Sequence, residues 1–346
     1  MAGALNSLLK SVSRSFYLSL RVLPAALRPA MGTAYLLCRA ADTVADTTLL
    51  PADRRLGLIG DIRTVFSVFP LPEEPVRRLA ATLKEELAGD PSPERVLISR
   101  LDECLDAFRA LSNTDRALTQ KVVTAVATGM EMDLQHFGAD SENLTAFETS
   151  DQLECYIGWI GGDPGRFWTE VCAAHGMKFK TDLTRMRDLG FHFGTGLQMV
   201  NILRDLPADL KMGRCYIPLD RLMAHGLAPE DLRSGKAEDR FRTLYHELID
   251  ETVDRLTSGL HYVENLSRMA IPARAAVWWP LALGLRTLGM LRGARSILEA
   301  TAPVKVQRRE VYWLMGTSLA ELPFDGLLRA DFTDLAEPAR SAAGFH

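Results

Sequence analysis

The sequence predicts an all-α protein, and three observations favour that fold class. Long stretches such as 114–138 and 238–265 carry apolar residues at spacings of three and four, the period of an amphipathic helix. No convincing run alternates apolar and polar residues, so we expect no extended strand. Clusters of Pro, Gly and Asp separate the helical stretches, as is typical of helix ends.

The predicted helices follow one another through short breaks. In chain order these breaks are FPLPEEP (69–75), GDPSPE (89–94), GGDPG (161–165), PLDR (218–221) and IPAR (271–274). We find no internal repeat and no long linker that would mark a boundary. We therefore expect a single all-α domain over residues 1–346, which ends in a polar tail at 321–346.

The composition limits the function classes. The chain has 346 residues, 47% of them apolar and 24% charged, which is ordinary for a globular protein with a large core. The net charge of -4 offers no basic footprint for nucleic acid. The five cysteines lack CxxC spacing and are odd in number, so we expect reduced thiols in a cytoplasmic protein rather than disulfides or a zinc site.

No segment predicts membrane insertion. The N-terminus lacks the basic and apolar regions of a signal peptide. The most apolar later stretch, 275–285, is interrupted by Pro280 and is shorter than the roughly 20 residues that a bilayer span requires. Peripheral contact with a membrane stays open, as does the oligomeric state.

A first polar stripe lies on the apolar stretch that contains CRAADTVADT (38–47). Asp42 and Asp46 are four residues apart, so on a helix both carboxylates share one face, with Tyr35 and Arg39 in line with them. Like charges in this position repel. The face therefore favours the binding of a cation.

A second stripe repeats this pattern within GLQMVNILRDLPADLKMGRCYIP (196–218). Gln198, Asn201, Asp205 and Asp209 fall on one helical face, and Arg204 precedes the first aspartate. A lone acid pair arises often by chance on a solvated face, but two pairs on apolar helices, each beside an arginine, are a stronger signal. Pro207 lies between the aspartates and predicts a kink or an end of this helix.

These stripes predict a chemistry. If the four aspartates faced one another across a bundle, they would bind a hard cation such as Mg²⁺, which commonly recruits phosphate. Arg39, Arg204 and Arg214 are suited to hold phosphate oxygens. The sequence therefore suggests a diphosphate leaving group. A di-iron bundle needs Glu-x-x-His motifs, which are absent, and HELID (246–250) lacks the second histidine of a zincin motif.

The chain resembles the squalene/phytoene synthase family. The resemblance rests on SVSRSF (11–16), AYLLCRAADTVAD (34–46), GMEMD (129–133), CYIGWIGG (155–162) and LQMVNILRDLPADLKMGRCYIP (197–218), which occur in family order over about residues 6–320. It implies an isoprenoid synthase helical bundle around a deep apolar cavity. It also implies the head-to-head joining of two prenyl diphosphates with Mg²⁺.

The resemblance implies roles for individual residues. Asp42, Asp46, Asp205 and Asp209 would hold Mg²⁺, and Tyr156 would assist proton removal as a cyclopropyl intermediate forms. The diphosphate-binding set would be Ser13, Arg14, Arg39, Gln198, Asn201, Arg204, Arg214 and Tyr216. Because water quenches an allylic carbocation, the pocket must be apolar and closed. Its wall would include Phe16, Tyr35, Trp278 and Trp279.

The segment APVKVQRREVYWLM (302–315) resembles the basic segment that family members with a reductive step use for NADPH. Lys305 and Arg308 would meet the 2′-phosphate of that cofactor. We therefore expect two farnesyl diphosphates to be joined through presqualene diphosphate and reduced to squalene. The alternatives are phytoene, dehydrosqualene or presqualene diphosphate formed without reduction, and, against the intact aspartate motifs, a non-catalytic helical subunit.

Overall fold

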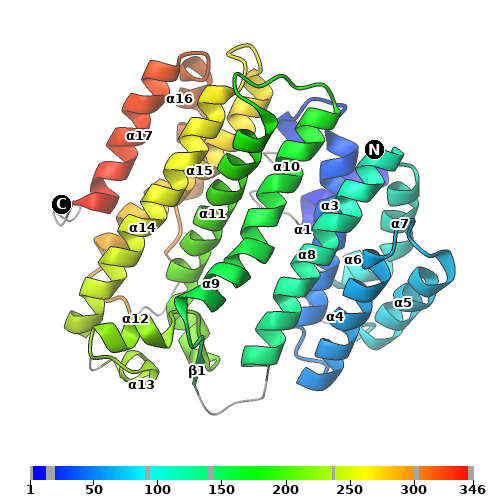
Figure 1. The fold of residues 1–346 in the computed structure, drawn as a ribbon, viewed down its shortest axis with the longest axis horizontal. Coiled ribbons are helices and arrows are strands. Elements are labelled where there is room, and N and C mark those ends of the chain that lie inside the picture. The colour runs from blue at the N-terminus through cyan, green and yellow to red at the C-terminus, as the bar shows by residue number, and fades with distance from the viewer. Residues whose placement is uncertain are drawn as a thin grey trace. The chain divides into compact units, whose positions relative to one another are not determined.

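The computed structural model describes residues 3–12, 20–89, 94–138, 144–235, 238–298 and 304–341. Nearly all its elements are helices, so the all-α prediction is confirmed (Figure 1). The chain divides into two compact units, one formed by Met1–Asp140 with Arg166–Lys178 and the other by Ser141–Gly165 with Phe179–His346. The single domain expected from the sequence stays a prediction.

The first unit is built around the long helix α8. Its elements are α1 (Gly3–Val12), α3 (Arg28–Asp46), α4 (Ala52–Ser67), α5 (Glu73–Glu86), α6 (Arg95–Ser99), α7 (Leu101–Arg109), α8 (Asn113–Phe137) and most of α10 (Asp163–Ala174). The Ser112 hydroxyl caps α8 by accepting a hydrogen bond from the Asp115 N–H at 3.1 Å. The apolar face of α8 packs on α3 and α4 and holds α3 in place.

The second unit is built around α11. Its elements are β1 (Thr145–Ala146), α9 (Ser150–Ile157), the π-helical turn η1 (Gly158–Gly162), α11 (Leu183–Lys211), β2 (Arg214–Cys215), α12 (Leu219–Ala224), α13 (Pro229–Arg233), α14 (Glu238–Asn265), α15 (Ile271–Arg292), α16 (Arg308–Glu321) and α17 (Asp325–Arg340). Helix α11 packs on α14, α14 on α15 and α15 on α17 (Figure 1). The two short strands pair in parallel, with Thr145 opposite Arg214.

The segment expected to be a polar tail contains the helix α17. Leu328, Phe332, Ala336 and Ala339 are buried in it, at spacings of four, four and three residues. These side chains form one apolar stripe, and the helix packs through it against α14 and α15. Residues 325–340 therefore contribute to the core of the second unit.

Helix α11 does not end at Pro207 but continues to Lys211. Proline has no N–H, so the carbonyl of Leu203, four residues earlier, loses its normal helical donor. The buried Tyr245 hydroxyl on α14 replaces that donor, with its oxygen 2.9 Å from the Leu203 carbonyl oxygen. This contact keeps Asp205 and Asp209 on one continuous helix.

We expect Tyr245→Phe to lower the free energy of unfolding by about 1–3 kcal/mol, because it leaves the Leu203 carbonyl buried without a donor. Urea denaturation followed by circular dichroism measures this change. Tyr312→Phe removes the same hydroxyl from an exposed position on α16 and should leave stability nearly unchanged. Equal stability of both variants would show that Tyr245 does not compensate for Pro207.

Glycines bring the η1 turn against α11 with their backbones in direct contact. A Cβ on Gly194 would lie 2.1 Å from the Gly161 carbonyl oxygen, and a Cβ on Gly161 would lie 2.4 Å from the Gly194 carbonyl oxygen. Neither position has room for a side chain, because the obstructing atoms are backbone. The Gly161 Cβ would also be 3.0 Å from the Cβ of Gln198. The turn therefore packs beside the polar stripe of α11.

Among the residues that the structure describes, no helix combines the length and apolar content needed to cross a bilayer.

Candidate active site

The predicted stripe on α3 is present in the first unit. Between Ala30 and Asp46, all side chains are buried except a single row of five. These are Tyr35, Cys38, Arg39, Asp42 and Asp46. The packed core of the unit therefore leaves one row at its edge, in which Asp46 is exposed and the other four residues are half-buried. Cys38, which the sequence did not single out, belongs to this row.

Asp42 carries its charge at an electrostatic cost. Arg39 donates to its carboxylate, and the second guanidinium arm of Arg39 reaches Glu94 at 2.7 Å. Burial, followed by repulsion from Asp46, nevertheless raises the pKa of Asp42 to about 6. One arginine shared between two acids does not compensate for the burial of this negative charge. A bound cation would provide that compensation.

The position of the acids on α3 adds to this cost. Asp42 and Asp46 lie in the last two turns, where the helix dipole disfavours negative charge. No basic side chain belongs to the last turn of α3. Arg55, from α4, donates to the Ala45 carbonyl at 2.8 Å and offsets part of the dipole.

The second stripe lies toward the C-terminal end of α11, as the first does on α3. Arg204 forms a bidentate pair with Asp205, with N–O distances of 2.9 and 2.5 Å. This hydrogen bond raises the pKa of the Arg204 guanidinium, against the effect of burial. One turn earlier, the Asn201 amide donates to the Gln198 side-chain oxygen at 3.3 Å. The structure thus aligns the polar side chains predicted for this helix.

An aromatic cluster follows the short sheet of the second unit. Tyr156 on α9 stacks on Tyr216, just after β2, with ring centroids 5.2 Å apart and an angle of 23° between the planes. Phe147, just after β1, contacts both rings at 5.7 and 6.0 Å. Pairing of β1 with β2 therefore brings together two predicted site residues that are distant in sequence. Arg214 enters the same region as the first residue of β2.

The donor set fits a metal shared with a phosphate ligand. The part of the chain that the structure describes contains no group of three or more His, Cys, Asp or Glu side chains able to hold a metal by themselves. Mg²⁺, however, is usually bound by one or two carboxylates, several waters and the phosphates of the substrate. Each stripe offers two carboxylates and an arginine at a helix end that favours added positive charge.

Other predicted residues lie elsewhere. Trp278 and Trp279 are buried on α15, and the Trp279 indole N–H donates to the Ser318 hydroxyl at 3.1 Å. Lys305, three residues before α16, and Arg308, the first residue of that helix, are both exposed. Ser13, Arg14 and Phe16 lie outside the described residues. The roles assigned to these residues, and the deep apolar cavity, stay predictions.

Sequence reasoning missed three contributors to the site. Glu94 accepts a hydrogen bond from Arg39, although it lies 55 positions away in the sequence, and no local pattern indicates this contact. Arg55 and Phe147 were also missed, because their roles arise from tertiary contacts.

Comparison with known proteins identifies the relatives. The family model described as squalene/phytoene synthase matches residues 9–310. A protein named presqualene diphosphate synthase, from Zymomonas mobilis subsp. mobilis, is 28% identical over 257 residues, which cover 73% of this chain and 72% of the relative. A bifunctional lycopene cyclase/phytoene synthase from Colletotrichum graminicola is 27% identical over 268 residues, which cover 76% of this chain but only 41% of that relative.

A solved structure shows the fold. TcSQS in complex with the ligand BPH1237 matches with a TM-score of 0.70 at 18% identity, over 98% of this chain and 97% of that chain. At this identity the likeness concerns the fold alone. The isoprenoid synthase helical fold expected from the sequence is confirmed.

Proposed function

The chain belongs to the squalene/phytoene synthase family, and on that premise we propose that it joins two farnesyl diphosphates head to head to form presqualene diphosphate. The observation that carries this proposal is the pair of accessible acid and arginine stripes at the C-terminal ends of α3 and α11. The match to a presqualene diphosphate synthase over nearly three quarters of both chains supports this product.

In this proposal the stripes bind two diphosphates. Asp42, Asp46, Asp205 and Asp209 would hold Mg²⁺, which would supply positive charge to a bound diphosphate. Arg39 and Arg204 are already held in place by carboxylates, so they can orient phosphate oxygens with little loss of side-chain freedom. Arg214, positioned by the short sheet, adds a third guanidinium.

The carbon chemistry requires a base after ionisation. The allylic cation formed from the first farnesyl diphosphate is attacked by the double bond of the second, and loss of one proton closes the cyclopropane ring. Tyr156 lies in a buried aromatic cluster with Tyr216, where its ring is shielded from water and its hydroxyl can help to carry that proton. Aromatic faces there also stabilise passing positive charge.

A second candidate product is squalene, formed when presqualene diphosphate ionises again and NADPH donates hydride. Lys305 and Arg308 favour it, because both cations are exposed, one just before α16 and one at its first residue, and are available to a 2′-phosphate. Phytoene from a longer prenyl diphosphate is the remaining alternative within the family. A non-catalytic role would leave the two acid stripes without a ligand.

Product analysis tests the proposal. The protein is incubated with farnesyl diphosphate and Mg²⁺, with and without NADPH, and the products are identified by mass spectrometry. Presqualene diphosphate in both reactions supports the proposal, and squalene only with NADPH supports the second candidate. Phytoene from geranylgeranyl diphosphate, with no product from farnesyl diphosphate, would contradict both.

We expect Tyr156→Phe to slow formation of the first intermediate by about a hundredfold, since a positioned acid or base contributes 10²–10⁴-fold. The aromatic stack should remain because the ring is kept, so thermal unfolding should change little. Single-turnover chemical quench measures the rate. Tyr262→Phe, another buried tyrosine of the same unit, is the matched control and should keep the rate. An unchanged rate in Tyr156→Phe would remove this residue from the mechanism.

A further inference from the structure

Helix α16 presents an apolar face to solvent. Tyr312, Trp313 and Leu319 are exposed and lie within about a third of the helix circumference, while Leu314 and Ser318 are buried on the opposite side. No charged residue occurs between Glu310 and Glu321. A solvated helix normally carries charges on its outer face, so this surface is unusual.

The turn that follows α16 extends this face. Phe324 lies one turn beyond Leu319 along the chain and is exposed, as is Leu327 in the first turn of α17. Met269, in the loop before α15, is 87% exposed. Its neighbour Arg268 donates to Asp325 at 3.2 Å, which places this loop beside Phe324. These three exposed apolar side chains therefore lie near the C-terminal end of α16.

A buried arginine fixes this surface in place. Arg274 is fully buried and donates to the carbonyls of Leu322 at 2.5 Å and Val263 at 2.8 Å, and to the Asp325 carboxylate at 2.6 Å. It thus ties the ends of α14 and α16 to the start of α17. The exposed apolar side chains therefore belong to helix ends that hydrogen bonds hold in place.

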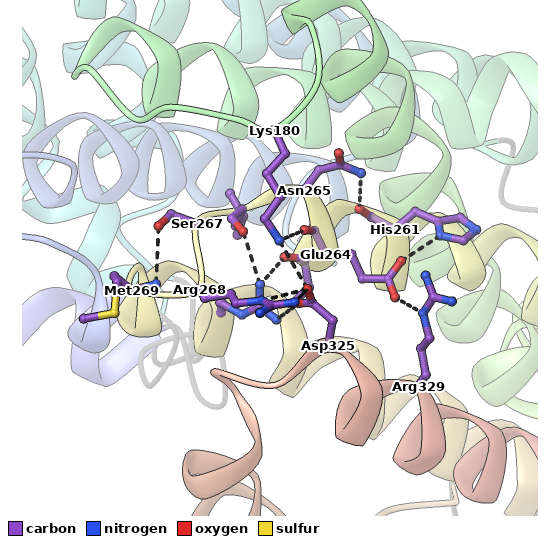
Figure 2. A network of polar contacts seen from close by, with 12 residues as sticks. Lys180, His261, Glu264, Asn265, Ser267, Arg268, Met269, Asp325 and Arg329 are labelled. Carbon is purple, nitrogen blue, oxygen red and sulfur yellow. Dashed lines mark hydrogen bonds and ion pairs between the residues drawn. The ribbon is translucent and has the colours of Figure 1, made fainter.

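Three exposed cations lie near the loop of Met269 and the start of α17. Arg329 pairs with Glu264, and the arginine side chain is 65% exposed against 11% for the glutamate. Arg268 pairs with Asp325, and the arginine side chain is 64% exposed against 20% for the aspartate. Lys180 also reaches Asp325, and Figure 2 shows these three cations around the two acids. In each pair the positive charge is the more accessible member, although the whole chain is negative.

We propose that this surface, the docking face, binds an anionic phospholipid bilayer. It consists of Met269, Tyr312, Trp313, Leu319, Phe324 and Leu327. Tyrosine and tryptophan favour the boundary between lipid headgroups and acyl chains, and exposed Arg and Lys attract anionic headgroups. A symmetric pairing of two docking faces would instead bring like cations together. The proposal goes beyond the proposed function and does not depend on it.

Co-sedimentation with vesicles tests the docking face without any substrate. We expect the full chain to pellet with vesicles of phosphatidylglycerol and phosphatidylcholine and to stay in the supernatant with phosphatidylcholine alone. The double variant Trp313→Ser/Phe324→Ser should bind about tenfold or more weakly, because each ring removes buried apolar area at the membrane. Met223→Ser changes an equally exposed apolar residue on α12 and should bind like the unmodified chain.

Three outcomes would overturn the proposal. The first is no binding to anionic vesicles, and the second is equal binding to both lipid mixtures. The third is a dimer in size-exclusion chromatography that Trp313→Ser/Phe324→Ser dissociates, which would identify the face as a contact between copies. Unchanged circular dichroism of the double variant verifies that a loss of binding is not a loss of folding.

Discussion

Asp205→Asn is expected to lower the turnover of farnesyl diphosphate by about a thousandfold, as is typical when a preorganised electrostatic contact to the reacting group is removed. Asparagine keeps the shape of the side chain and can still accept from Arg204, so the local fold should persist. It loses the negative charge that would hold a cation beside the diphosphate. Release of inorganic diphosphate measures the activity.

Asp254→Asn is the matched control for this loss. Asp254 is an exposed acid on α14 that pairs with Arg340, so its substitution removes the same charge from the same kind of pair. We expect it to retain full activity. If Asp205→Asn were as active as Asp254→Asn, the stripe on α11 would have no role in binding the diphosphate.

Asp42→Asn extends the test to α3 and separates activity from stability. We expect a comparable loss of turnover. Above its pKa of about 6, the ionised Asp42 carboxylate destabilises the folded chain, so its neutralisation should leave the unfolding free energy at neutral pH equal or higher. A stable but inactive variant is the expected mark of an acid retained for ligand binding. A strongly destabilised variant would show that Asp42 has a structural role.

Gly194→Ala is expected to cost about 3 kcal/mol or more of stability, because its Cβ would overlap the Gly161 carbonyl oxygen. The obstructing atom belongs to the backbone, so relief requires η1 and α11 to move apart. That shift would also disturb Gln198, which lies beside Gly161, and activity should fall with stability. Urea denaturation measures the first effect and diphosphate release the second.

Gly316→Ala controls for the intrinsic effect of the same substitution. A Cβ on Gly316, in the middle of α16, would meet nothing within 4 Å. Alanine is the better helix former, so this variant should be more stable by about 0.5–1 kcal/mol. We therefore expect the free energy of unfolding to fall in Gly194→Ala and to rise in Gly316→Ala. A Gly194→Ala variant as stable as Gly316→Ala would mean that the two backbones are not in contact.

The sequence predicted the helices whose apolar period is uninterrupted. The stretches 114–138 and 238–265 correspond to α8 (Asn113–Phe137) and α14 (Glu238–Asn265) almost residue for residue. The polar stripes on α3 and α11 were also predicted, because helical spacing alone decides which side chains share a face.

What the sequence did not reveal depends on contacts between distant segments. Continuation of α11 past Pro207 requires a donor from Tyr245, which lies 42 residues away from Leu203. The approach of η1 to α11 requires glycines from two separate segments to coincide. Glu94 reaches Arg39 only through the fold. Local pattern carries no information on any of these pairings.

The most direct test of the proposed function is the stoichiometry of diphosphate release. The unmodified chain is incubated with farnesyl diphosphate and Mg²⁺, without NADPH, and both the substrate consumed and the inorganic diphosphate released are measured. We expect one diphosphate for every two farnesyl diphosphates consumed, because presqualene diphosphate retains the second. Release of one diphosphate for each farnesyl diphosphate, or no release at all, would contradict the formation of presqualene diphosphate as the product.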